Sequence, residues 1–138
     1  MASQKIVRKI VSTNLAPKPV GPYNQAVVVD NTVYLSGVLG MNVQDTQLVE
    51  GGVVAQAKLA LTNMGQILRA AGSDYDKVVK TTIFLKNLED FTHVNEVYKD
   101  FFKTNHPARS TFEVSKLPLG ALVEIEAVAV KGEVVTVV

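Results

Sequence analysis

Two glutamates near the carboxyl end of the chain are the residues best placed to do acid-base chemistry. Glu124 and Glu126 alternate with Val123, Ile125 and Ala127, so a strand here would carry both carboxylates on one face. Their Cα atoms would lie about 7 Å apart. Two like charges raise each other's pKa, which lets a glutamate hold or donate a proton near neutral pH. The alternative is a solvated strand face with no chemical role.

Arg109 is the basic residue best placed to join them. It begins a second β-rich run in which Arg109, Thr111 and Glu113 share one face. If that run pairs with the strand that carries Glu124, the arginine lies near the glutamates. A guanidinium binds a carboxylate through two parallel hydrogen bonds, so a clamp for a small carboxylic acid is predicted. The alternative is an ion pair between Arg109 and Glu113, Glu124 or Glu126.

Tyr23 and Asn95 are further candidates for contact with a ligand. Tyr23 follows a glycine–proline pair in a loop, where its hydroxyl either faces a ligand or packs on its own domain. Asn95 lies near the buried stripe of a predicted helix and either donates to a ligand or caps a strand end. His93 and His106 lack partners at metal-ligand spacing, so we expect surface histidines and no metal site.

Composition excludes several classes of protein. The chain has no cysteine, which excludes disulfides, thiolate nucleophiles and cysteine metal sites. Its 14 basic and 13 acidic residues nearly cancel, and no run of five like charges occurs, so nucleic-acid binding is disfavoured. The glycine pairs match neither nucleotide-binding fingerprint, and no serine–histidine–aspartate grouping can be argued.

The elements that must position these residues follow from periodicity and turn residues. Apolar residues recur at three- and four-residue steps from Val53 to Ala71, which predicts a helix with Gly72 as its C-terminal cap. A second helix is expected from about Asp90, its N-cap, to Phe102. Its predicted buried stripe is Phe91, Val94, Tyr98, Phe101 and Phe102. Predicted strands cover residues 5–13, 25–36 as a hairpin turning at Asp30-Asn31, 78–86, 109–114 and 122–130.

The order of these elements predicts an α+β protein with residues 1–138 in a single domain. Two helices would cover one face of a mixed sheet. Strand 78–86 has apolar residues on both faces, with Val79 and Ile83 on one side and Val78 and Phe84 on the other. Because the helices cover one face only, the apolar residues of the other face predict an oligomer.

The amino-terminal region lacks a secretory signal, and no run of about 18 apolar residues predicts a membrane span. We therefore expect a cytoplasmic protein. The absence of acidic residues before Asp30 leaves a mitochondrial location open, and a nuclear one is not excluded by the sequence.

Six short motifs, in order and at near-constant spacing over the whole chain, resemble the RidA (YjgF-like) family, in particular its animal members. They are Gly21-Pro22-Tyr23-Asn24-Gln25-Ala26, Leu35-Ser36-Gly37, Val79-Lys80-Thr81-Thr82, Phe91-Thr92-His93-Val94-Asn95, Pro107-Ala108-Arg109-Ser110 and Val123-Glu124-Ile125-Glu126-Ala127. Each motif alone is weak, but six in register are specific.

The resemblance implies a chorismate-mutase-like α+β fold, with a mixed six-stranded sheet, assembled as a homotrimer with sites between subunits. It implies hydrolysis of 2-imino and enamino acids, such as 2-iminopropanoate and 2-iminobutanoate, to 2-keto acids and ammonia, without cofactor or metal. By position, Arg109 would grip the substrate carboxylate, and Glu124 would orient the attacking water and manage the proton for leaving ammonia.

The same resemblance implies which residues bind the substrate. Tyr23, Ser36 and Asn95 would line the pocket, with Gly37 and the backbone of Thr111 close by.

Three positions depart from the family pattern. Thr111 stands where many members have cysteine, Val38 where glutamine often follows Ser-Gly, and Leu119 where lysine is common. Two other functions stay open at this point. One is a trimer that binds small carboxylates, or acts as a chaperone or regulator, without turnover; the other is an endoribonuclease that inhibits translation.

Overall fold

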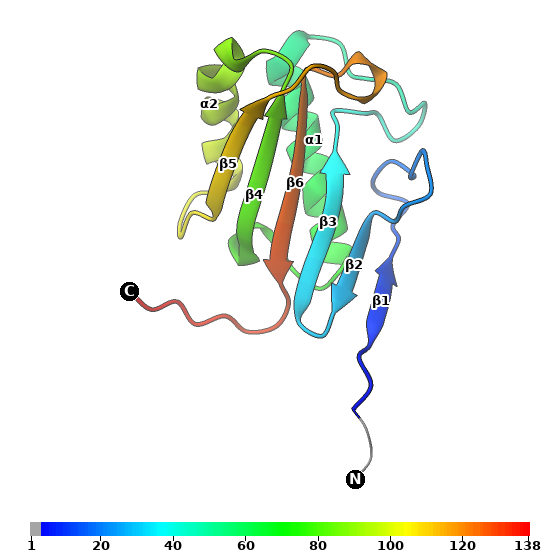
Figure 1. Ribbon diagram of the computed structural model, residues 1–138, viewed down its shortest axis with the longest axis vertical. Coiled ribbons are helices and arrows are strands. Elements are labelled where there is room, and N and C mark those ends of the chain that lie inside the picture. Colours follow the sequence, from blue (N-terminus) through cyan, green and yellow to red (C-terminus); the bar gives the residue numbers. More distant parts are fainter. Residues whose placement is uncertain (1–3) are drawn as a thin grey trace.

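Residues 4–138, which the computed structural model describes, form a six-stranded sheet with two helices against one face (Figure 1). The strands are β1 (Arg8–Val11), β2 (Ala26–Val29), β3 (Thr32–Val38), β4 (Val78–Leu85), β5 (Ala108–Glu113) and β6 (Val123–Val130). The helices are α1 (Gly52–Ala70) and α2 (Phe91–Phe101), with 3-10 turns at Tyr75–Lys77, Leu88–Asp90 and Pro118–Gly120.

The strands lie in the order β1-β2-β3-β6-β4-β5. The β4–β5 pair is parallel and the other four pairs are antiparallel, so the sheet is mixed. This arrangement confirms the predicted fold class. Asp30 turns the β2–β3 hairpin with a φ of 52°, a conformation that short polar residues tolerate.

The pairing on which the predicted Arg109–Glu124 contact depended is wrong. The contact required β5 to pair with β6, but β4 lies between them and pairs with both. A parallel neighbour needs a crossover connection, and α2 supplies it between β4 and β5. The last two strands therefore do not form a hairpin, although they are consecutive in the chain.

The core lies between the sheet and α1. Leu61, Met64 and Leu68 of the helix are fully buried and face Val123 and Ile125 of β6, which are also fully buried. Each such side chain contributes about 1.5–3 kcal/mol through removal from water. The predicted alternation of β6 is thus confirmed, because its apolar set is in the core and both glutamates face away. Within residues 4–138, neither helix combines the length and apolarity that a membrane crossing requires.

The predicted burial of two residues, Val79 and Phe91, needs correction. Val79 was expected on the same side as Ile83, but it is 48% exposed, and Val78 is buried instead. The β4–β6 register shifts between Val78 and Lys80, and such a bulge reverses the alternation. Phe91 was placed on the buried stripe of α2 but is 38% exposed. It is the first residue of that helix, and Asp90 stands at its N-cap without a side-chain capping bond.

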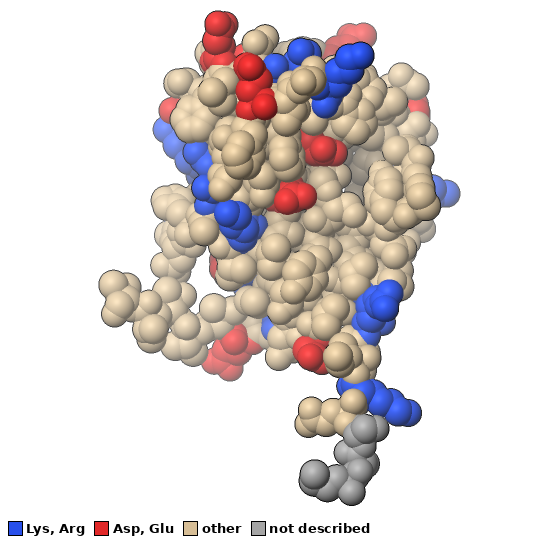
Figure 2. Space-filling model, in the orientation of Figure 1, with Lys and Arg blue, Asp and Glu red and all other residues tan. Residues whose placement is uncertain are grey.

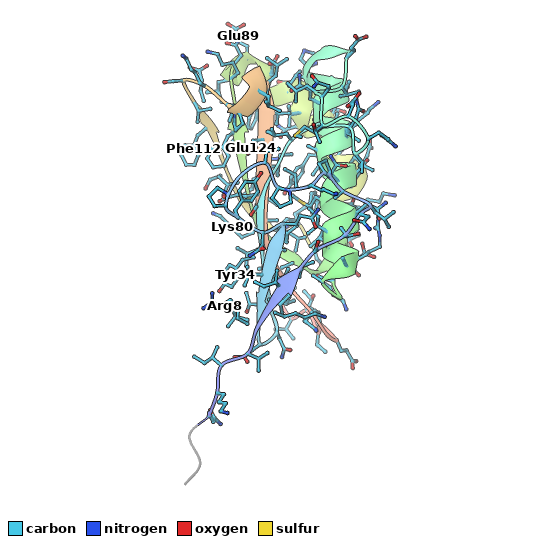
Figure 3. The ribbon with its side chains drawn as sticks, turned by 90° about the vertical axis from the view of Figure 1, so that its right-hand side faces the viewer. Arg8, Tyr34, Lys80, Glu89, Phe112 and Glu124 are labelled. Atoms are coloured by element: carbon cyan, nitrogen blue, oxygen red, sulfur yellow. The ribbon has the colours of Figure 1, made fainter. Side chains whose placement is uncertain are left out.

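The sheet face opposite the helices is uncovered and largely apolar. Tyr34 and Phe112 are 51% and 53% exposed on it, and Phe112 stacks on Phe84 with ring centroids 6.5 Å apart. Figure 2 shows this face as mostly uncharged surface with a few separate charges. In Figure 3 the side chains of Tyr34, Phe112, Lys80 and Glu124 project from the sheet on the side away from α1.

Candidate active site

A cavity of about 350 Å³ opens beside Glu124. Its walls come from separate parts of the chain, namely the loop before β2, the end of β3, helix α1 and the Pro118 turn. The residues that line it are Pro17, Lys18, Pro19, Val20, Tyr23, Gln25, Ser36, Gly37, Val38, Leu39, Met41, Asn63, Ile67, Pro118 and Glu124. Four predicted site residues, Tyr23, Ser36, Gly37 and Glu124, are therefore brought together.

Glu124 reaches the cavity because β3 is irregular at this point. The β3–β6 register shifts between Leu35 and Val38, so Ser36 and Gly37 form a bulge next to the glutamate. A Cβ added to Gly37 would lie 2.7 Å from the Glu124 carboxyl carbon, closer than real Cβ atoms come. Any side chain at position 37 would thus displace the carboxylate, which gives the glycine a direct role in shaping the site.

The surroundings of Glu124 disfavour its charged form. Desolvation by burial raises the pKa of this carboxyl, and the negative charge of Glu126 two residues along the strand raises it further. Both causes act in the direction that the sequence predicted. Glu124 is therefore suited to exchange a proton closer to neutral pH than an exposed glutamate is.

One buried amide fixes the loop that forms the outer wall. The Gln25 side chain accepts a hydrogen bond from Thr13 N–H at 2.7 Å and donates to the carbonyls of Thr13 and Pro17 at 3.1 and 2.9 Å. Tyr23 stands on this loop, where its hydroxyl accepts from Val20 N–H at 3.2 Å. The hydroxyl of Ser36 donates to the Asn24 carbonyl at 2.6 Å. The loop is thus held to the sheet by polar groups of the site itself.

Two side-chain amides of α1 fix the segments on the opposite side of the cavity. Asn63 donates to the carbonyls of Leu39 and Met41 at 3.1 and 3.0 Å, and Gln56 accepts from Leu122 N–H at 2.8 Å. We did not single out Asn63 or Gln56 from the sequence. The signal was present, because both are amides among the apolar positions of a helix, and buried amides need partners.

Arg109 lies elsewhere, on the helix-covered side of edge strand β5. Its guanidinium carbon is 4.8 Å from the ring centre of Tyr98 and 5.5 Å from that of Phe91, both on α2. Asn95 is half-buried on the same helix face, between the two rings in sequence. Ion pairs among the described residues join Arg69 to Asp74 and Glu96 to Lys99, so the alternative that Arg109 pairs with a glutamate of its own chain is wrong for residues 4–138.

Within one chain, Arg109 and Glu124 cannot touch the same small molecule. Arg109 is level with Thr81 and hence with Ala127, whereas Glu124 pairs with Phe84, and the two side chains point to opposite faces. From strand spacing and rise, their Cα atoms are roughly 14 Å apart. The predicted site residues thus fall into two groups, one around Glu124 and one around Arg109 with Asn95.

The remaining predicted positions are placed as follows. Thr111 is half-buried on β5, two residues from Arg109, and Val38 lines the cavity. Leu119 is 59% exposed in the turn before β6, with a φ of 60°. His93 and His106 are exposed, as predicted. No group of three His, Asp or Glu side chains in residues 4–138 is arranged to hold a metal ion.

The fold is that of a known class of small α+β proteins. The family model described as endoribonuclease L-PSP matches residues 13–131. The human 2-iminobutanoate/2-iminopropanoate deaminase is 53% identical over 131 residues, which is 95% of this chain and 96% of the human one. The Drosophila melanogaster RutC family protein UK114 is 57% identical, with 95% of each chain covered.

Solved structures support the same family. The structure of the Escherichia coli protein TdcF with bound serine is 38% identical to this chain and superposes with a TM-score of 0.85. The match covers 90% of this chain and 99% of the TdcF chain. The chain therefore belongs to the L-PSP family, which includes the RidA and YjgF proteins, and the predicted family is confirmed.

Proposed function

We propose that this protein is a 2-iminobutanoate/2-iminopropanoate deaminase, which hydrolyses 2-imino acids to 2-keto acids and ammonia. The observation that carries the proposal is a half-buried carboxylate, Glu124, whose pKa is raised, at the mouth of a cavity in a chain 53% identical to a deaminase of that name. TdcF, with serine bound, supports a site for a small amino-acid-like carboxylate in this family.

The reaction requires few catalytic groups. The imine carbon next to a carboxylate is electrophilic, so binding the substrate and placing one water are the main tasks. Arg109 binds the carboxylate of the substrate. Glu124 takes a proton from water as the oxygen attacks the imine carbon, and returns it to the nitrogen, which gives a carbinolamine. Glu124 then takes the proton of the new hydroxyl group and passes it to the amine. The C=O bond forms as the C–N bond breaks, and ammonia leaves.

Arg109 and Glu124 can contact the same substrate molecule only if they come from different subunits. We propose a homotrimer in which Arg109 of one subunit faces the Glu124 cavity of the next. The uncovered apolar sheet face supports association, because exposed apolar surface of this kind marks interfaces. The five potential donors of Arg109 support it as well, since no salt bridge or hydrogen bond within residues 4–138 uses them.

The test is the rate of 2-iminobutanoate loss when the imine is generated from threonine by a dehydratase. Wild-type protein should accelerate the loss, and Glu124→Gln should lower kcat by about 10²–10³-fold because it removes acid-base help. Arg109→Ala should chiefly raise KM. Lys9→Ala, which removes a basic residue at the exposed end of β1, is the matched control for Arg109 and should leave the rate unchanged. No acceleration by folded wild-type protein would overturn the proposal.

Ribonuclease activity is tested on the same preparations, because the family description names it. If RNA is cleaved while 2-iminobutanoate is not hydrolysed, the ribonuclease function replaces the deaminase.

A further inference from the structure

The guanidinium of Arg109 lies against two aromatic rings of α2. Its central carbon is 5.5 Å from the ring centre of Phe91 and 4.8 Å from that of Tyr98, within the range of a cation–π contact with each. No salt bridge or hydrogen bond within residues 4–138 uses its N–H groups, so they are available to a carboxylate.

Tyr98 cannot easily move away from Arg109. Its ring is 5% exposed and packs on Phe102 at a centroid distance of 4.5 Å. Its hydroxyl shares a 2.8 Å hydrogen bond with Thr81 Oγ1, which is fully buried on β4. Thr81 is also the register partner of Arg109 across the β4–β5 pair. The bond therefore ties the ring on α2 to the strand beside the arginine.

From this geometry we infer that Tyr98, fixed by Thr81, is a positioning residue that orders the Arg109 guanidinium for the substrate carboxylate. An unrestrained arginine must lose side-chain entropy when it binds a ligand. The Tyr98–Thr81 pair removes part of that loss in advance. The inference rests on the proposed role of Arg109 as the carboxylate clamp.

Burial keeps Tyr98 in its neutral form, which suits this role. Desolvation raises the pKa of its hydroxyl, while the Thr81 hydrogen bond and the positive charge of Arg109 lower it in part. The contact between Tyr98 and Arg109 is therefore that of a neutral aromatic ring with a cation.

Three variants of the full-length protein test the inference. Tyr98→Leu removes the ring and should raise KM for 2-iminobutanoate, and Kd for 2-oxobutanoate, about tenfold with kcat nearly unchanged. Tyr98→Phe and Thr81→Val keep the packing and remove only the hydrogen bond, so KM should rise about threefold. These two conservative variants keep the inference testable if Tyr98→Leu folds poorly.

Tyr75→Leu is the matched control. The hydroxyl of Tyr75 donates a hydrogen bond to the Leu61 carbonyl, and its ring packs on Phe101 and Phe102, but the guanidinium beside it belongs to Arg69 instead of Arg109. Its loss should lower stability and leave KM unchanged. Equal effects of Tyr75→Leu and Tyr98→Leu on KM would mark a general loss of packing and overturn the inference.

A second readout separates the inference from the proposed function. In ligand-free protein, ¹⁵N relaxation of the Arg109 Nε–Hε group should show an ordered side chain in wild type and Tyr75→Leu, and a mobile one in Tyr98→Leu. If wild-type protein hydrolyses no imine, the proposed function fails, yet this measurement still decides whether Tyr98 orders Arg109. An equally ordered Arg109 in Tyr98→Leu would overturn the positioning role.

Discussion

At the scale of single residues, the proposed reaction depends on Glu124, a carboxylate whose charged form is disfavoured. Glu124 has desolvation as the main cause of its raised pKa and Glu126 as the second. A group whose pKa is raised in the folded state contributes stability that is present below the unfolded pKa and lost as pH rises through the folded pKa. Because Glu124→Gln has no carboxyl group to ionise in the folded state, the variant avoids this loss of stability. Its free energy of unfolding at pH 7 should be no lower than that of wild type.

The pH dependence of catalysis follows from the same pKa. In its proposed role as proton acceptor, Glu124 must be ionised, so kcat/KM should fall as pH falls through its raised pKa. Glu126→Gln removes one cause of the shift and should move this acid limb to lower pH. Burial remains, and the pKa should stay above that of an exposed glutamate.

The measurement is the pH profile of kcat/KM for 2-iminobutanoate, corrected for spontaneous hydrolysis at each pH. Glu133→Gln, at an exposed position beyond β6, is the control and should leave the acid limb in place. A profile that Glu126→Gln does not shift would contradict the assignment of the acid limb to Glu124.

At the scale of elements, α1 supports both the core and the site. One of its faces buries apolar residues against β6, and its two buried amides hold the segments that follow β3 and precede β6. Asn63 fixes the loop with two hydrogen bonds to buried carbonyls. The cavity therefore depends on a helix that supplies no reacting group.

Asn63→Ala should destabilise the protein by about 2–4 kcal/mol, because two buried carbonyls lose their donor. Urea unfolding measures the change. Thr62→Ala on the exposed side of the same helix is the control and should change stability by less than about 0.5 kcal/mol. A loss below about 1 kcal/mol for Asn63→Ala would show that water replaces the amide.

At the scale of the whole molecule, the separation of Arg109 and Glu124 within one chain is the reason for the proposed association. At substrate concentrations below the wild-type KM, trimers of Arg109→Ala subunits alone or of Glu124→Gln subunits alone should show little activity. In a trimer refolded from an equal mixture, however, some interfaces combine an intact arginine from one subunit with an intact glutamate from the next. Random mixing should restore about a quarter of the wild-type sites.

Light scattering should give a mass three times the 14.9 kDa of the chain, and the 2-iminobutanoate assay of the mixture gives the recovered activity. Mixing without prior unfolding is the control and should recover little. An inactive refolded mixture that is trimeric would overturn the composite site.

What could be predicted from the sequence was local. The alternation of Glu124 with buried neighbours, the stripe of α1 and the β2–β3 turn at Asp30 depend on backbone period and residue type, so they are present in the sequence itself. The grouping of Tyr23, Ser36, Gly37 and Glu124 came from the family resemblance, and the cavity brings these four together.

What only the tertiary structure decided was non-local. Strand order depends on which pairings and crossovers bury the most surface, and residues 109–130 alone cannot tell that β4 lies between β5 and β6. The bulges near Val78 and at Ser36-Gly37 depend on the partner strand. Arg109 therefore lies against Tyr98 instead of Glu124, because the face and neighbour of a side chain are set by the strand beside it.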